Sequence, residues 1–383
     1  MAKKTINVGL IGYKFMGKAH SNAYVSAPKY FDLKATPVLK AVCGRDKAAV
    51  TAFAEQWGWE SVETDWKALV ARKDIDLVDV STPNNVHKEI AVAAARAGKH
   101  ILCEKPLAMN AAEGEAMVEA AEAAKVVNTL CHNYRRVPAV SLAKQMIEAG
   151  ELGELYHFRG VYLQDWIVDP AFPLVWRLRK ELAGSGVHGD LNAHIIDLAL
   201  WLVGGIAEVT GMMKTFITER PLPSEEGSLA AKGGTKTGTV TVDDAAAFLA
   251  RFEGGAIGTF EATRFATGRK NGQRLEINGS KGSIVFELER LNELQFYNNS
   301  DAEGRHGFRL IQATDPGHPY IAAYWPPGHI IGYEHSFINT VADVLNGIAD
   351  GTPVHPTFAE GLAVQKVLDA VERSAESGTW VSV

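Results

Sequence analysis

A lysine stands in a position suited to chemistry, within the triplet Glu104-Lys105-Pro106. The apolar run just before it, 101–103, predicts a buried strand. In a parallel sheet, ligands bind at the carboxyl ends of the strands. Lys105 is therefore a candidate for a catalytic or binding role, although the same arrangement would suit an ion pair on a loop.

A second set of reactive side chains lies in a glycine-rich turn that leads into an apolar helix, 184–202. Asp190, His194 and Asp197 share roughly one face of that helix, because they are spaced by four and three residues. A histidine can act as a general base near neutral pH. A lone histidine on an apolar helix is more often a core residue, but the pairing of His194 with Asp190 favours a function.

The first predicted strand runs into a turn suited to a dinucleotide, GYKFMG at 12–17. Gly12 and Gly17 fit the first and third glycines of the dinucleotide fingerprint, while Lys14 stands where the second glycine normally lets the pyrophosphate approach. The start of the following helix still offers backbone N–H groups to a phosphate. The alternative is a tight turn with a structural role only. The cofactor contacts expected here are Gly12, Phe15, Met16 and Gly17.

The end of the second strand bears on the choice of cofactor. The acid that binds a ribose 2′-hydroxyl is expected at the strand tip, where this chain has Gly44 followed by Arg45. A small residue followed by an arginine suits a 2′-phosphate, whose geometry a guanidinium complements. The alternative is that Arg45 is a solvated residue at a helix start and that Asp46 caps the helix. The sequence therefore leaves the cofactor as NAD or NADP.

The loop after the third main strand, 81–87, lies at the same edge of the predicted sheet. Thr82 and Pro83 would shape the loop under the cofactor, and nearby asparagine amides could bind ribose or nicotinamide. An ordinary turn in which Asn85 caps the next helix is the alternative. The cofactor contacts expected in this loop are Thr82, Pro83, Asn84 and His87.

The elements that must position these residues alternate between strands and helices up to residue 131. Strands are predicted near 6–12, 35–43, 76–82, 99–104 and 127–131, with helices near 16–27, 46–57, 85–97 and 110–125. Alternation of this kind predicts a Rossmann domain, an α/β fold with a doubly wound parallel sheet. We place this dinucleotide-binding domain at 1–131.

After about residue 150 the pattern changes to longer strands of period two. They are predicted at 156–164, 246–252, 256–262 and 274–278, with hairpin turns at 253–255 and 279–282. This predicts an α+β domain, 132–383, for substrate binding and oligomerisation, with a large open, mostly antiparallel sheet whose exposed face another subunit would cover. Residues 219–241 are expected to form a surface loop. The closing helices, within 331–376, are expected to pack on the first domain or on the sheet.

Composition narrows the class of partner. The 383 residues are 46% hydrophobic and 22% charged, enough for two domains with separate cores. The net charge of -6 and the lack of a basic run argue against a nucleic acid or an anionic membrane as the partner, and favour a small molecule.

The sequence also bears on the location of the protein. No apolar run reaches the roughly 18 residues of a membrane span, and the first strand starts with no cleavable apolar segment before it. Cys43, Cys103 and Cys131 lie in or beside apolar strands, as expected of reduced thiols in a cytoplasmic protein.

The turn at 12–17, the triplet at 104–106 and the helix that carries Asp190 and His194 resemble the Gfo/Idh/MocA family of oxidoreductases in order and spacing. The resemblance covers nearly the whole chain. It implies a nucleotide-binding domain followed by an open antiparallel sheet. It also implies that Lys105, Asp190 and His194 act on a hydroxyl group of a sugar or cyclitol.

The residue types fit that reaction. Hydride leaves a carbinol carbon for the nicotinamide only if the hydroxyl proton is taken up, and His194 is the suitable base. Lys105 would hydrogen-bond the same oxygen and stabilise its developing charge, while Glu104 would help to position Lys105. Asp190 would hold the imidazole or a second hydroxyl.

Further contacts are expected around these groups. The pair Arg135-Arg136 could bind a carboxylate or a nucleotide diphosphate on the substrate, with an interdomain ion pair of one arginine as the alternative. His188 could complete a metal triad with Asp190 and His194, but the family resemblance involves no metal and we expect none. The expected substrate contacts are Lys105, Tyr134, Arg135, Tyr162, Gln164, Asp165, Asp190 and His194. The remaining expected cofactor contacts are Gly44, Arg45, Glu104, Lys105, Asn133, Trp176 and Arg177.

We therefore predict an NAD(P)-dependent oxidoreductase that transfers hydride between a nicotinamide cofactor and a secondary hydroxyl or ketone of a sugar, glycoside, anhydrosugar or cyclitol. One alternative is a glycoside-cleaving enzyme of the same fold, which would oxidise a hydroxyl transiently, eliminate the aglycone and return the hydride to a retained cofactor. The other is a non-catalytic sugar or nucleotide sensor, which the set of Lys105, Asp190 and His194 disfavours. A homodimer or homotetramer is expected from the open sheet.

Overall fold

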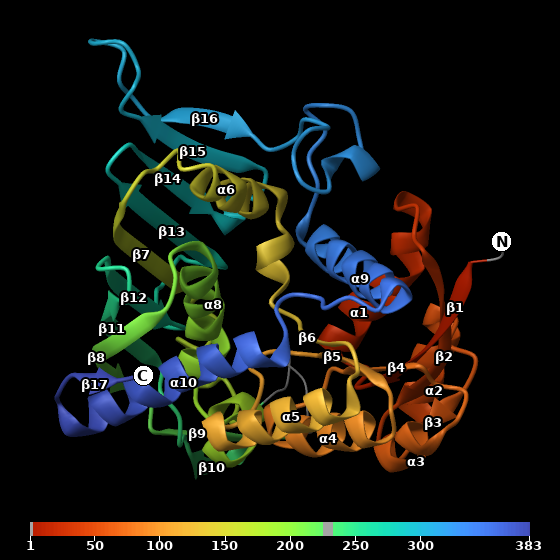
Figure 1. The fold of residues 1–383 in the computed structure, drawn as a ribbon. Helices are drawn as coiled ribbons and strands as arrows, with labels where there is room; N and C mark the ends of the chain where they lie inside the picture. Colours follow the sequence, from red (N-terminus) through yellow and green to blue (C-terminus); the bar gives the residue numbers. More distant parts are fainter. Residues whose placement is uncertain (1–2, 225–232) are drawn as a thin grey trace. The chain divides into compact units, whose positions relative to one another are not determined.

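The computed structural model describes residues 3–224 and 233–383, and its two main sheets lie in separate units of the chain (Figure 1). The first unit contains the residues up to 136 together with 331–363, and the second contains 137–330 together with 364–383. Helix α10 (Phe358–Ser377) therefore begins in the first unit and ends in the second. None of the helices described is long and apolar enough to cross a membrane.

The first unit is built on a parallel sheet with the strand order β3-β2-β1-β4-β5-β6. Its strands are β1 (Lys4–Ile11), β2 (Ala35–Cys43), β3 (Val62–Glu63), β4 (Leu77–Val80), β5 (His100–Cys103) and β6 (Asn128–Leu130). The helices between them are α1 (Phe15–Tyr30), α2 (Lys47–Trp57), α3 (Trp66–Ala71), α4 (His87–Arg96) and α5 (Ala111–Ala124). The predicted doubly wound α/β sheet is confirmed, and its strand order reverses between β1 and β4, where such sheets bind ligands. The two elements that the sequence did not predict, β3 and α3, have only two and six residues.

Helix α1 faces the sheet with small and polar residues. Its buried positions include Gly17, His20, Ser21 and Tyr24, which recur every three or four residues. Helix α9 (Tyr333–Asp350) packs against α1 within the same unit. Helices α4 and α5 share an apolar core with the sheet, to which Phe358 at the start of α10 also contributes.

The second unit is built on a nine-stranded sheet with the order β16-β15-β14-β13-β7-β12-β11-β8-β17. The strands are β7 (Leu155–Leu163), β8 (Ile206–Lys214), β11 (Ala245–Phe252), β12 (Ile257–Thr263), β13 (Gly272–Gly279), β14 (Gly282–Glu287), β15 (Glu293–Asn298), β16 (Arg309–Gln312) and β17 (Val381–Ser382). Neighbouring strands are antiparallel except β7 and β12, which are parallel. The prediction of a large, mostly antiparallel sheet is therefore confirmed.

Alternate residues separate the two faces of this second sheet. Phe158, Phe248 and Phe260 are buried on the face that helices α6 (Pro138–Glu148) and α8 (Ala193–Leu202) cover (Figure 1). The rings of Phe248 and Phe260 stack with their centroids 4.3 Å apart. On the opposite face, the side chains of Leu249 and Ile257 remain 48% and 50% exposed.

The expectation of a surface loop over 219–241 is wrong where the structure describes these residues. Strands β9 (Glu219–Pro223) and β10 (Gly233–Thr239) form an antiparallel pair, while 225–232 lie outside the described residues. Strand β9 is anchored by the buried guanidinium of Arg220, which donates to the carbonyl oxygens of Ile167 and Asp169 at 2.6 and 2.9 Å. The glycines and prolines of this segment therefore indicated a loop, whereas backbone pairing and the contacts of Arg220 stabilise a two-stranded ribbon.

The predicted catalytic helix begins with an irregular turn. Residues His188–Asn192 form a π-helical turn that continues into α8. The Asp243 carboxylate accepts hydrogen bonds from the N–H groups of Gly186 and His188 at 2.6 and 2.8 Å. A Cβ on Gly186 would lie 1.9 Å from the Asp243 carbonyl oxygen, so this turn requires glycine. Turns of the π type are frequent at functional sites.

Candidate active site

The turn between β1 and α1 packs backbone directly against backbone. Gly12 has a φ of +108°, and a Cβ there would lie 2.3 Å from the carbonyl oxygen of Ser81. A Cβ on Gly17 would lie 2.3 Å from the carbonyl oxygen of Gly12. Both positions therefore require glycine, as they do in a dinucleotide-binding turn.

The start of α1 is suited to a phosphate. Within the described chain no side chain caps this helix, and its first turn carries no acid. Phe15 in this turn is 55% exposed, and Met16 is half-buried. Nearby, the hydroxyl of Thr82 is buried and has no hydrogen-bond partner among the described residues. Uncapped N–H groups and a positive helix end fit the pyrophosphate of a dinucleotide.

The tip of β2 is occupied by an aromatic ring. A Cβ on Gly44 would lie 2.2 Å from the ring of Tyr13, whose centroid lies 6.1 Å from that of Phe53. The Asp46 carboxylate accepts the Ala49 N–H at 3.1 Å and so caps α2. The structure thus supplies a packing reason for Gly44, while Arg45 is exposed to solvent.

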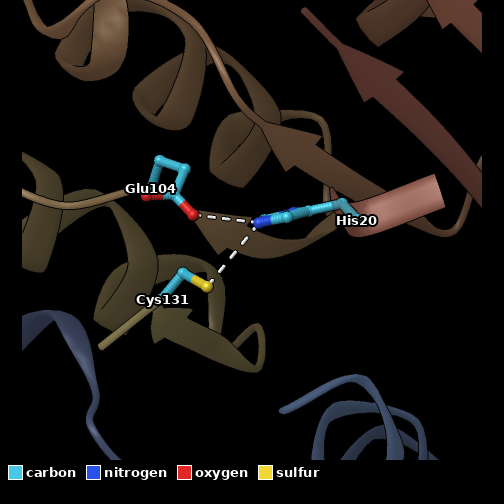
Figure 2. A group of neighbouring side chains, drawn as sticks. All are labelled: His20, Glu104 and Cys131. Atoms are coloured by element: carbon cyan, nitrogen blue, oxygen red, sulfur yellow. Dashed lines mark hydrogen bonds and ion pairs between the residues drawn. The ribbon is translucent and has the colours of Figure 1, made fainter. Parts of the chain in front are cut away.

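Glu104 belongs to a buried cluster of charged groups at the carboxyl ends of the strands. His20 Nδ1 lies 2.8 Å from Asp79 Oδ2, and His20 Nε2 lies 2.9 Å from Glu104 Oε1. Figure 2 shows Nε2 of the His20 ring pointing toward Glu104 and Cys131, and Cys131 Sγ lies 3.6 Å from this nitrogen. His20 and Asp79 are at most 1% exposed. Sequence reasoning missed this cluster, although Asp79 stands in the otherwise apolar strand β4.

The charges in the cluster stabilise one another. Burial alone would lower the pKa of the His20 imidazole, but the Asp79 carboxylate outweighs it and holds that pKa well above its usual value of 6.5. Burial alone would likewise raise the pKa of Glu104, but the His20 ring and the Lys105 ammonium lower it below 4.5. The second oxygen of Glu104 accepts the backbone N–H of Lys105 at 3.2 Å. The cluster therefore leads directly to the candidate catalytic lysine.

Two further predicted cofactor contacts have structural partners in the first unit. The buried ring of His87 places its nitrogens 3.0 and 3.1 Å from the carbonyl oxygens of Pro106 and Thr82. It thereby ties the loop after β4 to the loop that carries Lys105, and burial lowers the pKa of the ring. The amide of Asn133 donates to Ser336 Oγ at 2.8 Å.

The two arginines after β6 form ion pairs. The guanidinium of Arg135 is 2.7 Å from Glu360, and that of Arg136 is 2.7 Å from Asp343. The Glu360 carboxyl is partly buried, which by itself would raise its pKa. Hydrogen bonds from the backbone N–H of Thr357 and from the side chains of His355 and Arg135 outweigh burial and lower that pKa to about 2. The structure therefore places Arg135 in an ion pair, the alternative to substrate binding, although both partners lie in the first unit. Tyr134, beside them, is 3% exposed and packs edge-on against Tyr333.

In the second unit, Asp190 is paired with an arginine that sequence reasoning missed. The Asp190 carboxylate accepts a hydrogen bond from the guanidinium of Arg264, just beyond β12. Arg264 is 1% exposed and lies over the ring of Trp166, 5.0 Å from its centroid. The Asp190 side chain is 30% exposed, so Arg264 holds a carboxylate that solvent can still reach.

His194 and two predicted substrate contacts form a connected group in the same unit. The ring of Tyr162 lies 5.9 Å from that of His194. The Tyr162 hydroxyl and the Gln164 amide both donate to Asn271 Oδ1, at 2.8 and 3.0 Å. Gln164 in turn accepts the indole N–H of Trp166 at 2.8 Å. Asn271 was not predicted, because it lies 109 residues beyond Tyr162 in the chain.

Three other residues of the second unit that the sequence analysis singled out are held by contacts with neighbouring residues. His188 Nε2 lies 3.0 Å from the Leu368 carbonyl oxygen and its Nδ1 lies 3.0 Å from the Asn192 amide, which are structural contacts. Asp165 accepts hydrogen bonds from Lys270 and from the N–H of Gly268, and these lower the pKa of its half-buried carboxyl. The guanidinium of Arg177 stacks on the ring of Trp176, 4.5 Å from its centroid.

Two parts of the chain match models of known protein families. Residues 6–132 match the "Oxidoreductase family, NAD-binding Rossmann fold", and residues 140–285 match the "GFO/IDH/MocA C-terminal domain". The matches agree with the two units in order along the chain.

Known proteins also resemble the chain over nearly its whole length. A levoglucosan dehydrogenase of Pseudarthrobacter phenanthrenivorans is 45% identical over 99% of this chain and 98% of its own. A solved levoglucosan dehydrogenase in complex with NADH and levoglucosan is 45% identical, with a TM-score of 0.94 and 99% of both chains covered. An oxidoreductase domain protein of Kribbella flavida is 52% identical, with a TM-score of 0.95 and again 99% of both chains covered.

We expect the cluster around His20 to make stability depend on pH. In the unfolded chain His20 titrates near its usual pKa of 6.5, whereas in the folded chain it keeps its proton to much higher pH. Its contribution to the free energy of unfolding is therefore complete below the unfolded pKa and is lost as pH rises toward the folded pKa, by about 1.4 kcal/mol per pH unit. Glu104 does not titrate in this range, because its folded pKa lies below 4.5.

Denaturant unfolding of the wild type and of His20→Gln/Glu104→Gln, from about pH 7 to about pH 9, measures this contribution. The double variant removes both partners and should lack the slope, so the difference between the two proteins should shrink as pH rises. Parallel curves would contradict a protonated His20 in the folded protein.

Proposed function

Because this chain belongs to the Gfo/Idh/MocA family of oxidoreductases, we propose that it oxidises an anhydrosugar of the levoglucosan type at a secondary hydroxyl, with NAD as the hydride acceptor. It is an NAD-binding oxidoreductase that acts on sugars, as the sequence predicts. The choice of substrate is supported above all by the full-length similarity to a levoglucosan dehydrogenase that has been solved with NADH and levoglucosan.

We assign the chemistry to Lys105, Asp190 and His194. NAD, when bound, supplies a nicotinamide ring that accepts the hydride from the carbinol carbon. The hydroxyl proton goes to His194 as the general base, and the C–O bond becomes a carbonyl as the hydride leaves. Lys105 hydrogen-bonds the same oxygen and stabilises its negative charge before the carbonyl forms. In the reductive direction His194 returns the proton.

Asp190 is suited to hold His194 or a neighbouring substrate hydroxyl. Its pairing with the buried Arg264 orients the carboxylate, and 30% of the Asp190 side chain is exposed to solvent. Tyr162 supplies an aromatic ring with a hydroxyl, and Gln164 supplies an amide. This combination suits a polyhydroxylated sugar ring, whose faces are apolar and whose rim is polar. We propose the substrate contacts Lys105, Tyr134, Tyr162, Gln164, Asp165, Asp190 and His194, and leave out Arg135 because Glu360 engages it.

We propose NAD rather than NADP as the cofactor. The solved relative contains NADH. Packing against Tyr13 accounts for Gly44 without a 2′-phosphate. The cofactor contacts that we propose are the N–H groups at the start of α1 together with Gly12, Gly17, Thr82, Pro83, Asn84, Lys105, Trp176 and Arg177. The three cysteines are free and buried, which agrees with a cytoplasmic enzyme.

A panel of anhydrosugars, sugars and cyclitols, each incubated with NAD+ or NADP+, tests substrate and cofactor together. We expect levoglucosan with NAD+ to produce NADH, and kcat/KM with NADP+ to be lower by at least about tenfold. Preference for a cyclitol or for NADP+ would overturn the corresponding part of the proposal. Release of a free sugar from a glycoside without net NADH would instead indicate the oxidation-elimination reaction.

We expect His194→Ala and Lys105→Ala each to lower kcat by at least about two orders of magnitude, because proton removal and charge stabilisation are both needed in the transition state. Binding of NADH, measured by fluorescence titration, should survive in both variants. Lys29→Ala, which removes an exposed lysine from the last turn of α1, is the matched control. Near-normal turnover of either catalytic variant would rule out its assignment.

We propose that the open face of the nine-stranded sheet is covered by a second copy of the chain. Met212, Leu249 and Ile257 are 72%, 48% and 50% exposed on the neighbouring strands β8, β11 and β12. The neighbours of Leu249 and Ile257 along their strands are buried on the opposite face. A sheet face that leaves several large apolar side chains exposed is typical of a subunit interface.

Leu249→Glu/Ile257→Glu should therefore shift the protein to monomers, because two charges would be buried in each copy of the interface. Analytical ultracentrifugation of the variant and the wild type measures the shift. Ile330→Glu, which changes an apolar residue that is 74% exposed away from the sheet, should leave the assembly unchanged. A wild type that is already monomeric at micromolar concentration would contradict the proposal.

A further inference from the structure

Both ring nitrogens of His20 face carboxylate oxygens. Nδ1 lies 2.8 Å from Asp79 Oδ2, and Nε2 lies 2.9 Å from Glu104 Oε1. A neutral imidazole has one N–H, so it would donate to one carboxylate and point a lone pair at the other. A ring that donates to both must carry two protons and a positive charge.

The two carboxyl groups are surrounded by other donors, which suits their ionised forms. Asp79 also accepts hydrogen bonds from the hydroxyls of Tyr24 and Ser81, at 2.9 and 3.1 Å. Glu104 accepts the N–H of Lys105 through its second oxygen. The cluster thus alternates in sign, with the His20 cation between two anions.

The remaining groups that face the His20 ring carry no charge that would compete. The Cys131 thiol, which follows β6, lies near Nε2, and burial raises the pKa of this thiol to about 12. The pKa of the Tyr24 hydroxyl, on α1 itself, is raised well above 10.0 by burial and by Asp79. From α9, the ring of Phe337 packs 5.6 Å from the His20 ring.

We propose that His20 is a positioning residue for the reaction, a permanently protonated ring that fixes the Glu104 carboxylate and, through it, the backbone and ammonium group of Lys105. This inference rests on the proposed role of Lys105 and adds a residue to it. His20 stands one turn after Gly17 on α1. It therefore joins the helix that receives the pyrophosphate to the strand end that carries the lysine.

Removing the ring should act on Lys105 through the charge of Glu104. Without His20, the buried Glu104 carboxylate would lose its cationic partner, and burial would favour its protonated form. A neutral Glu104 would no longer hold the ammonium of Lys105 by charge. The substrate oxygen would then lose stabilisation in the transition state while the cofactor turn stays intact.

The same atoms could be taken for a metal site. His20 Nε2, Glu104 and the Cys131 thiol lie within 4.8 Å of one another (Figure 2). A metal would require an unprotonated Nε2 and a thiolate. The hydrogen-bond distance between Nε2 and Glu104 and the neutral thiol both favour a proton over a metal.

Steady-state kinetics with levoglucosan and NAD+ test the positioning role. We expect His20→Gln to lower kcat by at least about tenfold, with the KM for NAD+ within about threefold of the wild type. His100→Gln is the matched control, since His100 lies at the other end of β5.

A double-mutant cycle separates positioning from a general loss of structure. In a Glu104→Gln background, His20→Gln should cost less than about threefold in kcat, because the charge through which it acts is already gone. Equal losses of kcat in both backgrounds, or a loss in the KM for NAD+ as large as that in kcat, would overturn the proposal. Thermal unfolding of each variant shows whether it folds. If His20→Gln alone does not fold, the double variant Glu104→Gln/His20→Gln replaces it, because both side chains are then neutral.

Nitrogen NMR of the wild-type protein, labelled in its histidine rings, tests the protonation state without any turnover. Both nitrogens of His20 should remain protonated at about pH 8, well above the usual pKa of histidine. A single protonated nitrogen would overturn the proposal, and so would stoichiometric binding of Zn2+ that His20→Gln abolishes. If the wild type oxidises no sugar, the proposed function fails, whereas the NMR result still decides the state of His20.

Discussion

The direct packing of backbone on backbone at the end of β1 is the contact on which the first unit depends. Gly12 lies against the carbonyl of Ser81, and Gly17 lies against that of Gly12. This close approach brings the start of α1 to the carboxyl ends of β1 and β4. One turn later, the same helix carries His20 to Asp79 and Glu104. The proposed phosphate site and the charged cluster therefore both depend on one steric constraint, which only glycine satisfies.

Much of the fold could be predicted because its long elements carry a clear period. The strands of the parallel sheet and the helices α1, α2, α4 and α5 lie within a few residues of their predicted positions. The short β3 and α3 could not be predicted, since two and six residues do not establish a period. The ribbon of β9 and β10 was missed for a different reason, because its side chains are those of a turn and its pairing is decided by the backbone.

The sequence suggested members of the candidate site but not the residues that bind them. Lys105, Asp190 and His194 were identified from local spacing and from resemblance to a family. Asp190 binds Arg264, which is 74 residues away, and Arg135 binds Glu360, which is 225 residues away. Pairs so distant along the chain leave no local pattern. A usable signal did exist for the His20 cluster, because Asp79 interrupts an apolar strand and such a carboxylate must find a donor.

The first unit takes its last segment from near the end of the chain, and this affects how the protein is made. Strand β6 is bordered by the residues around Pro356, whose carbonyl oxygen accepts hydrogen bonds from the N–H of Leu130 and the hydroxyl of Thr129, both at 2.9 Å. Helix α9 covers α1 in the same unit. During synthesis from the ribosome, the parallel sheet therefore emerges long before its covering segment. It must wait, with an open strand edge, until nearly the whole chain has been translated, so folding of the first unit is completed only after most of the second unit, 137–330, has emerged.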